Sequence, residues 1–157
     1  QLAETGSWPH PKHKTWLFAS PDRLVWWPRE QKLALLEAKS VSKLTDGVPV
    51  AHLIQCQLQL ACAPATSWVD HAQSNDSELV VHRIFRDKEL TSFILLHLER
   101  VYKSALPFFS GDADDDNVFV DDMGTFARAE ELELAGLITD TRRLFVKPLS
   151  EKRPPLK

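Results

Sequence analysis

The sequence has few of the residues that mark a secreted or membrane-bound protein. Its 157 residues include only two cysteines, Cys56 and Cys62, which lie in one apolar segment without a Cys-x-x-Cys pattern. This number excludes a disulfide framework and predicts a reducing, intracellular setting. No apolar run approaches the roughly 20 residues of a membrane-spanning helix, and the first residues lack the pattern of a signal peptide. We therefore expect a soluble protein of the cytoplasm or nucleus.

An overall excess of positive charge is also lacking. The formal net charge is -3, so any surface that binds nucleic acid must be local. The chain is 43% hydrophobic and long enough for one compact core.

Short apolar runs predict two hairpins. One comprises residues 24–27 and 33–38, separated by Pro-Arg-Glu-Gln-Lys, and the other comprises residues 67–72 and 78–84, separated by a turn-forming stretch. Residues 16–19 predict a further strand, and residues 1–14 an extended lead-in that approaches the core. Near the end of the chain, Arg-Arg-Leu-Phe-Val-Lys-Pro-Leu predicts a final strand or an extended arm.

Helical spacing predicts two main helices. The first covers residues 50–63 and is opened by Pro49. The second begins after Asp87 as N-cap, runs to Ala105 and is stopped by Pro107. A short helix is also expected over residues 130–137. Together with the strands, these helices predict an α/β fold with a central mixed sheet flanked by helices.

One strand ends in two opposite charges, Glu37 and Lys39. Residues two apart on a strand point to the same face, so these side chains project together. A divalent ion such as Mg²⁺ needs hard oxygen ligands, which Asp22, Glu37 and the carbonyl of Ala38 would supply. Lys39 would then orient or deprotonate an attacking water. The alternative is a solvated ion pair at a strand end, because Glu-x-Lys alone is a common pattern.

The predicted helix after this strand carries further polar residues. His52, Gln55 and Gln59 are three and four positions apart and would form one polar stripe. This stripe either supports a site at Glu37 or faces solvent, whereas Gln57 points elsewhere.

The order of these motifs resembles a known family. "ASPDRLV", "LLEAK", "IQCQLQLA" and "HRIFRDKEL" are similar to segments of the YqaJ-type viral recombinase nucleases, relatives of phage lambda exonuclease in the PD-(D/E)xK superfamily. The resemblance extends over residues 5–107. It implies a restriction-endonuclease-like core in which Asp22 and Glu37 bind metal, Lys39 is the catalytic lysine and Gln55 supports the site. It also implies Mg²⁺- or Mn²⁺-dependent hydrolysis of DNA, often from double-stranded ends in recombination, and relatives that form ring-shaped trimers.

The sequence departs from the family pattern in two places. Arg23 stands where the family usually has glycine, so the turn after Asp22 lacks that glycine's access to positive φ. The family also places helices with acidic and basic residues upstream of residues 5–6, and this chain has none. We therefore expect residues 1–107 to be an N-terminally truncated nuclease core, with residues 108–157 as an extension of unassigned role. The alternative function is a catalytically inactive module that binds DNA or protein.

Other candidates have weaker patterns. His10 and His13 have a spacing that suits metal mainly on a helix, which Pro11 argues against. The acidic run at residues 111–116 is typical of a loop. The five tryptophans are expected mostly in packing. Arg83 and Arg86 are expected either to contact DNA phosphates or to be surface cations without a role.

Overall fold

The computed structural model describes residues 2–110 and 141–148, with side chains described for residues 2–107. The chain divides into two compact units, Gln1–Arg86 together with Asp140–Lys157, and Asp87–Thr139. The predicted helix at residues 130–137 and the acidic run at residues 111–116 lie outside the described residues.

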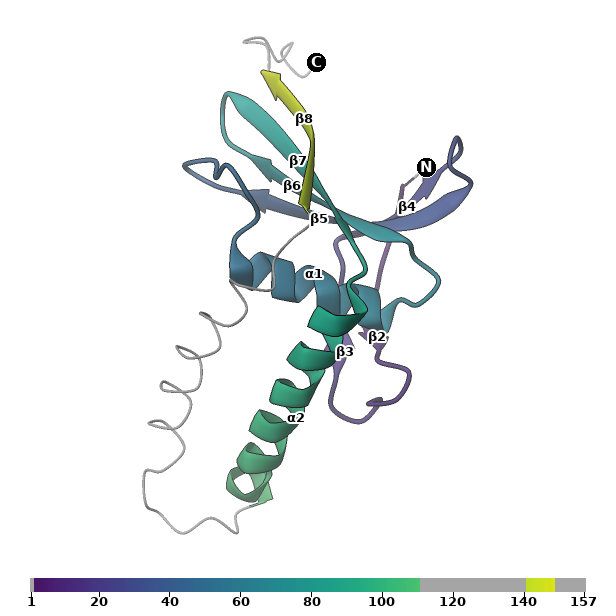
Figure 1. The fold of residues 1–157 in the computed structure, drawn as a ribbon, viewed down its shortest axis with the longest axis vertical. Coiled ribbons are helices and arrows are strands. Elements are labelled where there is room, and N and C mark those ends of the chain that lie inside the picture. Colours follow the sequence, from purple (N-terminus) through teal and green to yellow (C-terminus); the bar gives the residue numbers. More distant parts are fainter. Residues whose placement is uncertain (1, 111–140, 149–157) are drawn as a thin grey trace, which may run out of the picture. The chain divides into compact units, whose positions relative to one another are not determined.

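The first unit contains a six-stranded mixed sheet in the order β1-β4-β5-β6-β7-β8 (Figure 1). Its strands are β1 (Leu2–Glu4), β4 (Arg23–Trp27), β5 (Lys32–Ser40), β6 (Trp68–Ser74), β7 (Glu78–Phe85) and β8 (Thr141–Pro148). Only β5 and β6 pair in parallel within this sheet. A separate two-stranded sheet joins β2 (Trp8–Pro9) to β3 (Phe18–Ala19). The predicted mixed α/β architecture is therefore confirmed.

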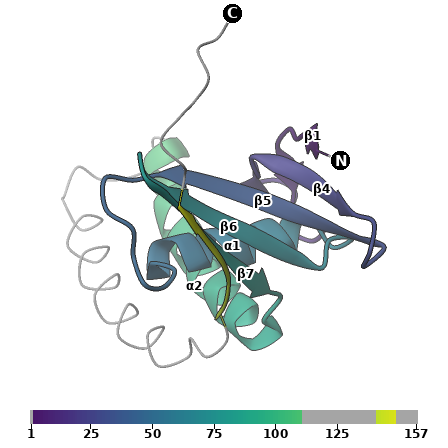
Figure 2. The same cartoon turned by 90° about the horizontal axis from the view of Figure 1, so that it is seen from above.

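The parallel pair requires a crossover, and α1 (Val50–Cys62) supplies it. Pro49 precedes the first helical turn, as predicted. In both views α1 lies along one face of the sheet (Figures 1 and 2). That face contains the centre of the core, since Leu35, Val69 and Ile84 lie in register on three neighbouring strands and are at most 1% exposed. The sequence order strand, helix, strand thus places α1 directly over β5 and β6.

Both predicted hairpins are confirmed, as β4–β5 and β6–β7. The turn of the first contains Gln31 with φ of 50°, the only positive φ among the non-glycine residues described. The predicted final strand is also confirmed, because β8 pairs antiparallel with β7. The predicted lead-in is extended, and the structure adds strand pairing that the sequence did not predict. Residues 2–4 add β1 to the edge of the sheet, and residues 8–9 pair with β3, because extended backbone next to an open strand gains ladder hydrogen bonds.

The second unit is described through α2 (Lys88–Ser110). Asp87 is its N-cap as predicted, with Oδ1 accepting a hydrogen bond of 2.9 Å from the backbone N–H of Leu90. The expectation that Pro107 stops the helix is wrong, since Pro107 lies inside it. Proline removes one backbone donor but fixes φ at a helical value, so the chain continues at the expense of one hydrogen bond. Neither described helix has the length and hydrophobicity to cross a membrane.

Candidate functional site

Asp22 and Glu37 come together where β4 begins and β5 ends. Arg23 pairs with Leu36 in the antiparallel ladder, so the next position outward sets Asp22 opposite Glu37. Oδ2 of Asp22 accepts a hydrogen bond of 2.7 Å from the backbone N–H of Ala38. This contact fixes the exposed Asp22 side chain against the strand that carries Glu37. The sequence prediction that the two carboxylates are neighbours therefore agrees with the hairpin register.

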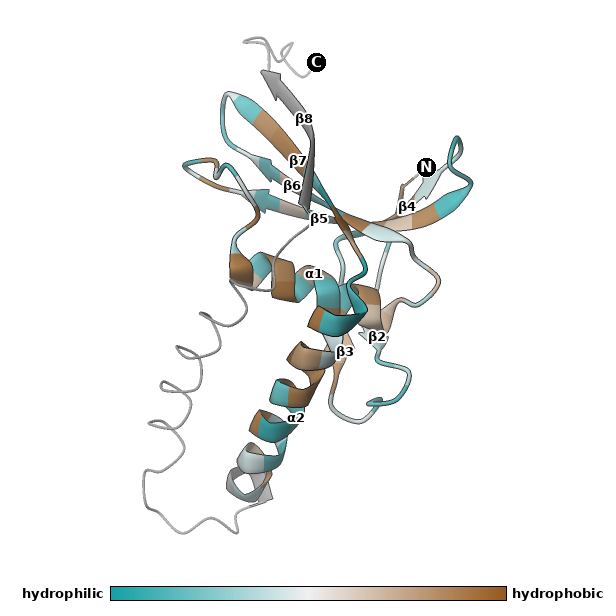
Figure 3. Cartoon of the chain, viewed as in Figure 1, coloured by the Kyte–Doolittle hydropathy of each residue, from teal (hydrophilic) through white to brown (hydrophobic). Residues whose placement is uncertain are grey.

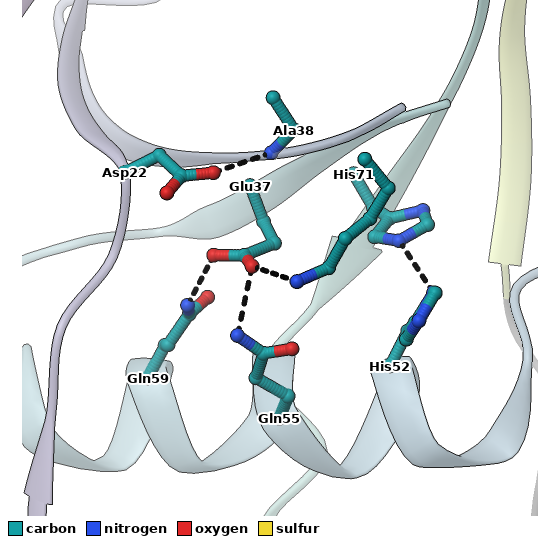
Figure 4. Close-up of polar contacts among 8 residues, drawn as sticks. Asp22, Glu37, Ala38, His52, Gln55, Gln59 and His71 are labelled. Carbon is teal, nitrogen blue, oxygen red and sulfur yellow. Dashed lines mark hydrogen bonds and ion pairs between the residues drawn. The ribbon is translucent and has the colours of Figure 1, made fainter. Parts of the chain in front are cut away.

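Glu37 is a buried anion held by three donors (Figure 4). Its residue is 2% exposed. Oε1 accepts from Nζ of Lys39 at 2.5 Å and from Nε2 of Gln55 at 2.8 Å, and Oε2 accepts from Nε2 of Gln59 at 2.6 Å. A buried carboxylate is tolerated only with such charged and hydrogen-bonding partners. The environment of Glu37 is therefore built to keep a negative charge away from bulk water.

The donors come from two elements. Lys39 lies two residues after Glu37 on β5 and its side chain is 28% exposed, so it reaches from the surface onto the carboxylate. Gln55 and Gln59 lie four apart on α1 and point at the same group (Figure 4). Gln57, between them, donates to the backbone carbonyl of Phe85 instead. The predicted polar stripe thus faces the site rather than solvent.

Hydropathy along α1 explains this orientation. Hydrophilic and hydrophobic bands alternate along α1 (Figure 3). Leu53, Cys56 and Leu60 are buried in the core. The glutamine stripe lies beside these core residues, so packing of the apolar face carries the amides to Glu37. Burial raises the pKa of the Cys56 thiol to about 12, so this cysteine is a packing residue and not a nucleophile.

A histidine pair adjoins the carboxylate, and the sequence analysis did not predict it. His71 lies opposite Glu37 in the parallel β5–β6 register and opposite His82 in the β6–β7 register. Nε2 of His71 is 3.1 Å from Nδ1 of His52 on α1 (Figure 4). Burial, reinforced by His52, His82 and Lys39, lowers the pKa of His71 to about 4. Burial and then Lys39 lower the pKa of His52, against an opposing effect of Glu37.

The arginines have structural roles that the sequence prediction missed. Arg83 makes a bidentate ion pair with the buried Asp70, and its guanidinium lies 4.1 Å from the centre of the Trp68 ring and 4.8 Å from that of Trp27. Both predicted roles of Arg83 are wrong. A side chain with these partners is not a surface cation without a role, and its guanidinium is not free to contact a DNA phosphate.

Arg86 closes the end of α1. Its guanidinium donates to the backbone carbonyls of Leu60, Ala63 and Thr66, at 2.6, 3.3 and 3.1 Å. The last carbonyls of a helix lack the usual helical partner, and Arg86 adds a charged donor to two carbonyls that also accept from Ala63 or Thr66, and to the carbonyl of Thr66 itself. The predicted roles of Arg86, a contact to DNA phosphate or a surface cation without a role, are therefore wrong as well.

Two other sequence features have local explanations. Nδ1 of His10 accepts from the backbone N–H groups of Lys12 and His13, both at 3.2 Å, so His10 stabilises a turn. Arg23 stands in the extended strand β4, so the residue after Asp22 needs no glycine. Its guanidinium donates to the backbone carbonyl of Asp22 at 2.7 Å and lies 3.5 Å from Glu4.

The carboxylate oxygens of Asp22 and Glu37 are compatible with binding of a divalent ion. The described contacts of Asp22 use Oδ2 only, and Oε2 of Glu37 accepts a single hydrogen bond. Mg²⁺ is commonly held by one or two carboxylates with water and substrate phosphate. Within residues 2–110 and 141–148 no cluster of three or more His, Cys, Asp or Glu side chains is arranged to hold a metal. The role of the Ala38 carbonyl as a third ligand stays a prediction.

Comparison with known proteins adds no relative. No family model, curated protein or solved structure matches this chain. Its function therefore has to be argued from the side chains gathered around Glu37.

Proposed function

We propose that this protein is a metal-dependent nuclease that hydrolyses DNA phosphodiester bonds, acting on double-stranded ends as an exonuclease. The observation that carries the proposal is the cluster of Asp22, Glu37 and Lys39, with Lys39 Nζ 2.5 Å from the Glu37 carboxylate. Two carboxylates and a lysine at one strand end are groups suited to metal-dependent phosphodiester hydrolysis. The mixed sheet with α1 on one face is compatible with a restriction-endonuclease-like core, which is part of this proposal.

In this proposal Asp22, Glu37 and the Ala38 carbonyl hold Mg²⁺ or Mn²⁺, which as a Lewis acid would polarise a phosphate oxygen and acidify bound water. Lys39 orients the attacking water or takes its proton, and its partly exposed position lets it reach substrate. Asp22 is fixed by Ala38, so the two carboxylates keep their separation.

Gln55 and Gln59 are positioning residues in this scheme. Each donates to a different oxygen of Glu37, which fixes the plane of the carboxylate. Residues that hydrogen-bond to a metal ligand fix its orientation. Loss of such a residue typically weakens metal binding or activity 10- to 100-fold.

The second candidate is a module that keeps the fold but has no activity. It is favoured by the number of donors already present on Glu37, because Lys39, Gln55 and Gln59 together neutralise and satisfy the carboxylate without a metal. Such a module would bind DNA or protein through its surface, and its affinity for Mg²⁺ would not depend on Glu37.

The test is digestion of linear duplex DNA with 5′-phosphates in Mg²⁺, Mn²⁺ or EDTA. The unchanged chain is compared with Lys39→Ala and with Lys43→Ala, which alters an exposed lysine of the loop between β5 and α1. We expect metal-dependent digestion that Lys39→Ala abolishes and Lys43→Ala retains, with both variants folded by circular dichroism.

Two outcomes contradict the proposal. Absence of digestion by the folded chain, with no effect of Glu37→Ala on Mn²⁺ affinity in calorimetry, would establish the inactive module. Full activity in Lys39→Ala would show that the nuclease site lies elsewhere.

A further inference from the structure

A cavity of about 420 Å³ lies beside the glutamines that hold Glu37. One wall is formed by residues 18–20, and the other by Ala51, Ile54, Gln55, Leu58 and Gln59 of α1. The α1 residues are spaced three and four apart, so they form one continuous face over two turns. The volume is within the roughly 300–1,000 Å³ range of small-molecule sites.

The cavity adjoins the candidate site, because the two share side chains. Gln55 and Gln59 line it and also donate to Glu37, and Ser20 lies two residues before Asp22. A group that occupies the cavity is therefore next to any phosphate held at the carboxylates. In a DNA strand, the groups next to a phosphate are the sugar and base of one nucleotide.

The chemistry of the walls selects between those parts of the nucleotide. No side chain that lines the cavity is charged, so the cavity offers nothing to a phosphate and suits a neutral group. Phe18, which is 50% exposed, supplies an aromatic surface, and Ile54 and Leu58 supply aliphatic ones. The amides and the Ser20 hydroxyl supply donors and acceptors. Aromatic and apolar walls with a few polar groups are the usual environment of an unstacked base.

We propose that this cavity is a subsite for an unpaired nucleobase, on the nucleotide whose phosphate lies at Asp22 and Glu37. The inference rests on the proposed function in that it takes DNA as the ligand. A base paired in a duplex is stacked on both faces and cannot enter a separate cavity. The substrate strand therefore reaches the carboxylates with its base unpaired, and frayed ends or single strands bind better than closed duplex.

The experiment measures binding in Ca²⁺, which can occupy the carboxylates and so hold the phosphate there, and a gel checks that both probes stay intact. The probes are an internally labelled duplex with two unpaired nucleotides on every strand end, and the same duplex with abasic residues at those positions. Fluorescence anisotropy gives the ratio of the two dissociation constants. We expect the base-containing probe to bind about tenfold more tightly, which is the usual scale for loss of one stacked base.

Two matched variants locate the effect. Ala51→Trp fills the cavity from an exposed position of α1, whereas Ala65→Trp makes the same change at an exposed position outside the cavity. We expect the ratio to fall to about one in Ala51→Trp and to persist in Ala65→Trp. Phe18→Ala removes the aromatic wall at a half-exposed site, and we expect it to reduce the ratio of the two dissociation constants clearly. This variant provides the test if Ala51→Trp fails to fold.

The outcomes separate this inference from the nuclease proposal. Discrimination that Ala51→Trp removes supports the base subsite even if the chain digests no DNA. Equal binding of both probes, discrimination that survives in both Ala51→Trp and Phe18→Ala, or no binding of either probe overturns the subsite. Digestion with Mg²⁺ alongside equal binding would leave the nuclease proposal standing without it.

Discussion

The ammonium group of Lys39 lies 2.5 Å from Oε1 of Glu37, a carboxylate whose side chain is 3% exposed. Lys39 is therefore the counter-charge of Glu37 within the described part of the chain. A carboxylate oxygen has room for about two donors, and Oε1 already accepts from Lys39 and Gln55. A divalent ion that uses this oxygen has to displace Lys39 or Gln55, and it is also repelled by the ammonium charge of Lys39.

Metal affinity should therefore rise when Lys39 is removed. We predict that Lys39→Met binds Mn²⁺ about tenfold more tightly than the unchanged chain, because one hydrogen bond between charged groups, worth ~1.5–3 kcal/mol, no longer competes. Lys43→Met removes an exposed charge from the loop that follows β5 and should change the affinity for Mn²⁺ less than about twofold. Calorimetry at fixed ionic strength measures both. An equal gain in Mn²⁺ affinity in the two variants would mean that long-range charge alone, and not the contact of Lys39 with Glu37, controls metal binding.

Stability should fall when Glu37 is neutralised. Glu37→Gln places an amide where Gln55 and Gln59 both donate, so at least one buried donor loses its acceptor. An unsatisfied buried group costs about 1–3 kcal/mol, and we predict that loss in the free energy of unfolding from urea titrations. Glu30→Gln, in the exposed β4–β5 turn, should stay within about 0.5 kcal/mol. A Glu37→Gln chain as stable as the unchanged one would show that the amides do not depend on the carboxylate.

Local patterns explain most of what could be predicted. The β4–β5 hairpin is specified by apolar runs around a turn, and its register brings Asp22 opposite Glu37. The three- and four-residue spacing of His52, Gln55 and Gln59 defines a single helix face, whatever that face contacts. These elements depend on neighbours close in sequence, so the sequence reveals them.

The missed features depend on pairing between distant segments. His71 joins the site only through the parallel register of β5 with β6, which no short pattern encodes. Arg86 acts on carbonyls more than 20 residues earlier, and β1 forms because an edge of β4 is available. Such contacts arise from packing of the whole sheet, so residue type alone could not distinguish Arg86 from a surface cation.

The role of Arg86 can be measured as a loss of stability. Arg86→Met removes one donor from each of three backbone carbonyls at and after the end of α1, of which those of Leu60 and Ala63 keep others, and we predict a cost of about 1–3 kcal/mol in the free energy of unfolding. Arg86→Lys should recover only part of it, because an ammonium cannot reproduce the planar fork of the guanidinium. Arg29→Met, in the exposed β4–β5 turn, is the matched control and should have little effect. An Arg86→Met chain as stable as the unchanged one would show that Arg86 is a surface cation without a structural role.

The buried His71 should make stability depend on pH in a definite window. Its pKa is about 4 in the folded chain against an ordinary 6.5, because burial and the neighbouring His52, His82 and Lys39 disfavour the imidazolium. The unfolded chain therefore binds more protons than the folded chain between these values. The stabilisation is fully present above pH 6.5 and is lost as the pH falls toward 4.

A quantitative comparison isolates His71 from the carboxylates that also titrate in acid. The pKa difference corresponds to about 3 kcal/mol, so the unchanged chain should lose about that much more stability than His71→Gln between pH 6.5 and 4. Gln31→Asn, which replaces no titratable group in the exposed β4–β5 turn, should keep the pH dependence of the unchanged chain. Urea titrations at half-unit pH intervals measure all three. Parallel stability curves for His71→Gln and the unchanged chain would mean that His71 is protonated as easily in the folded as in the unfolded state, and that the histidine pair beside Glu37 is open to water.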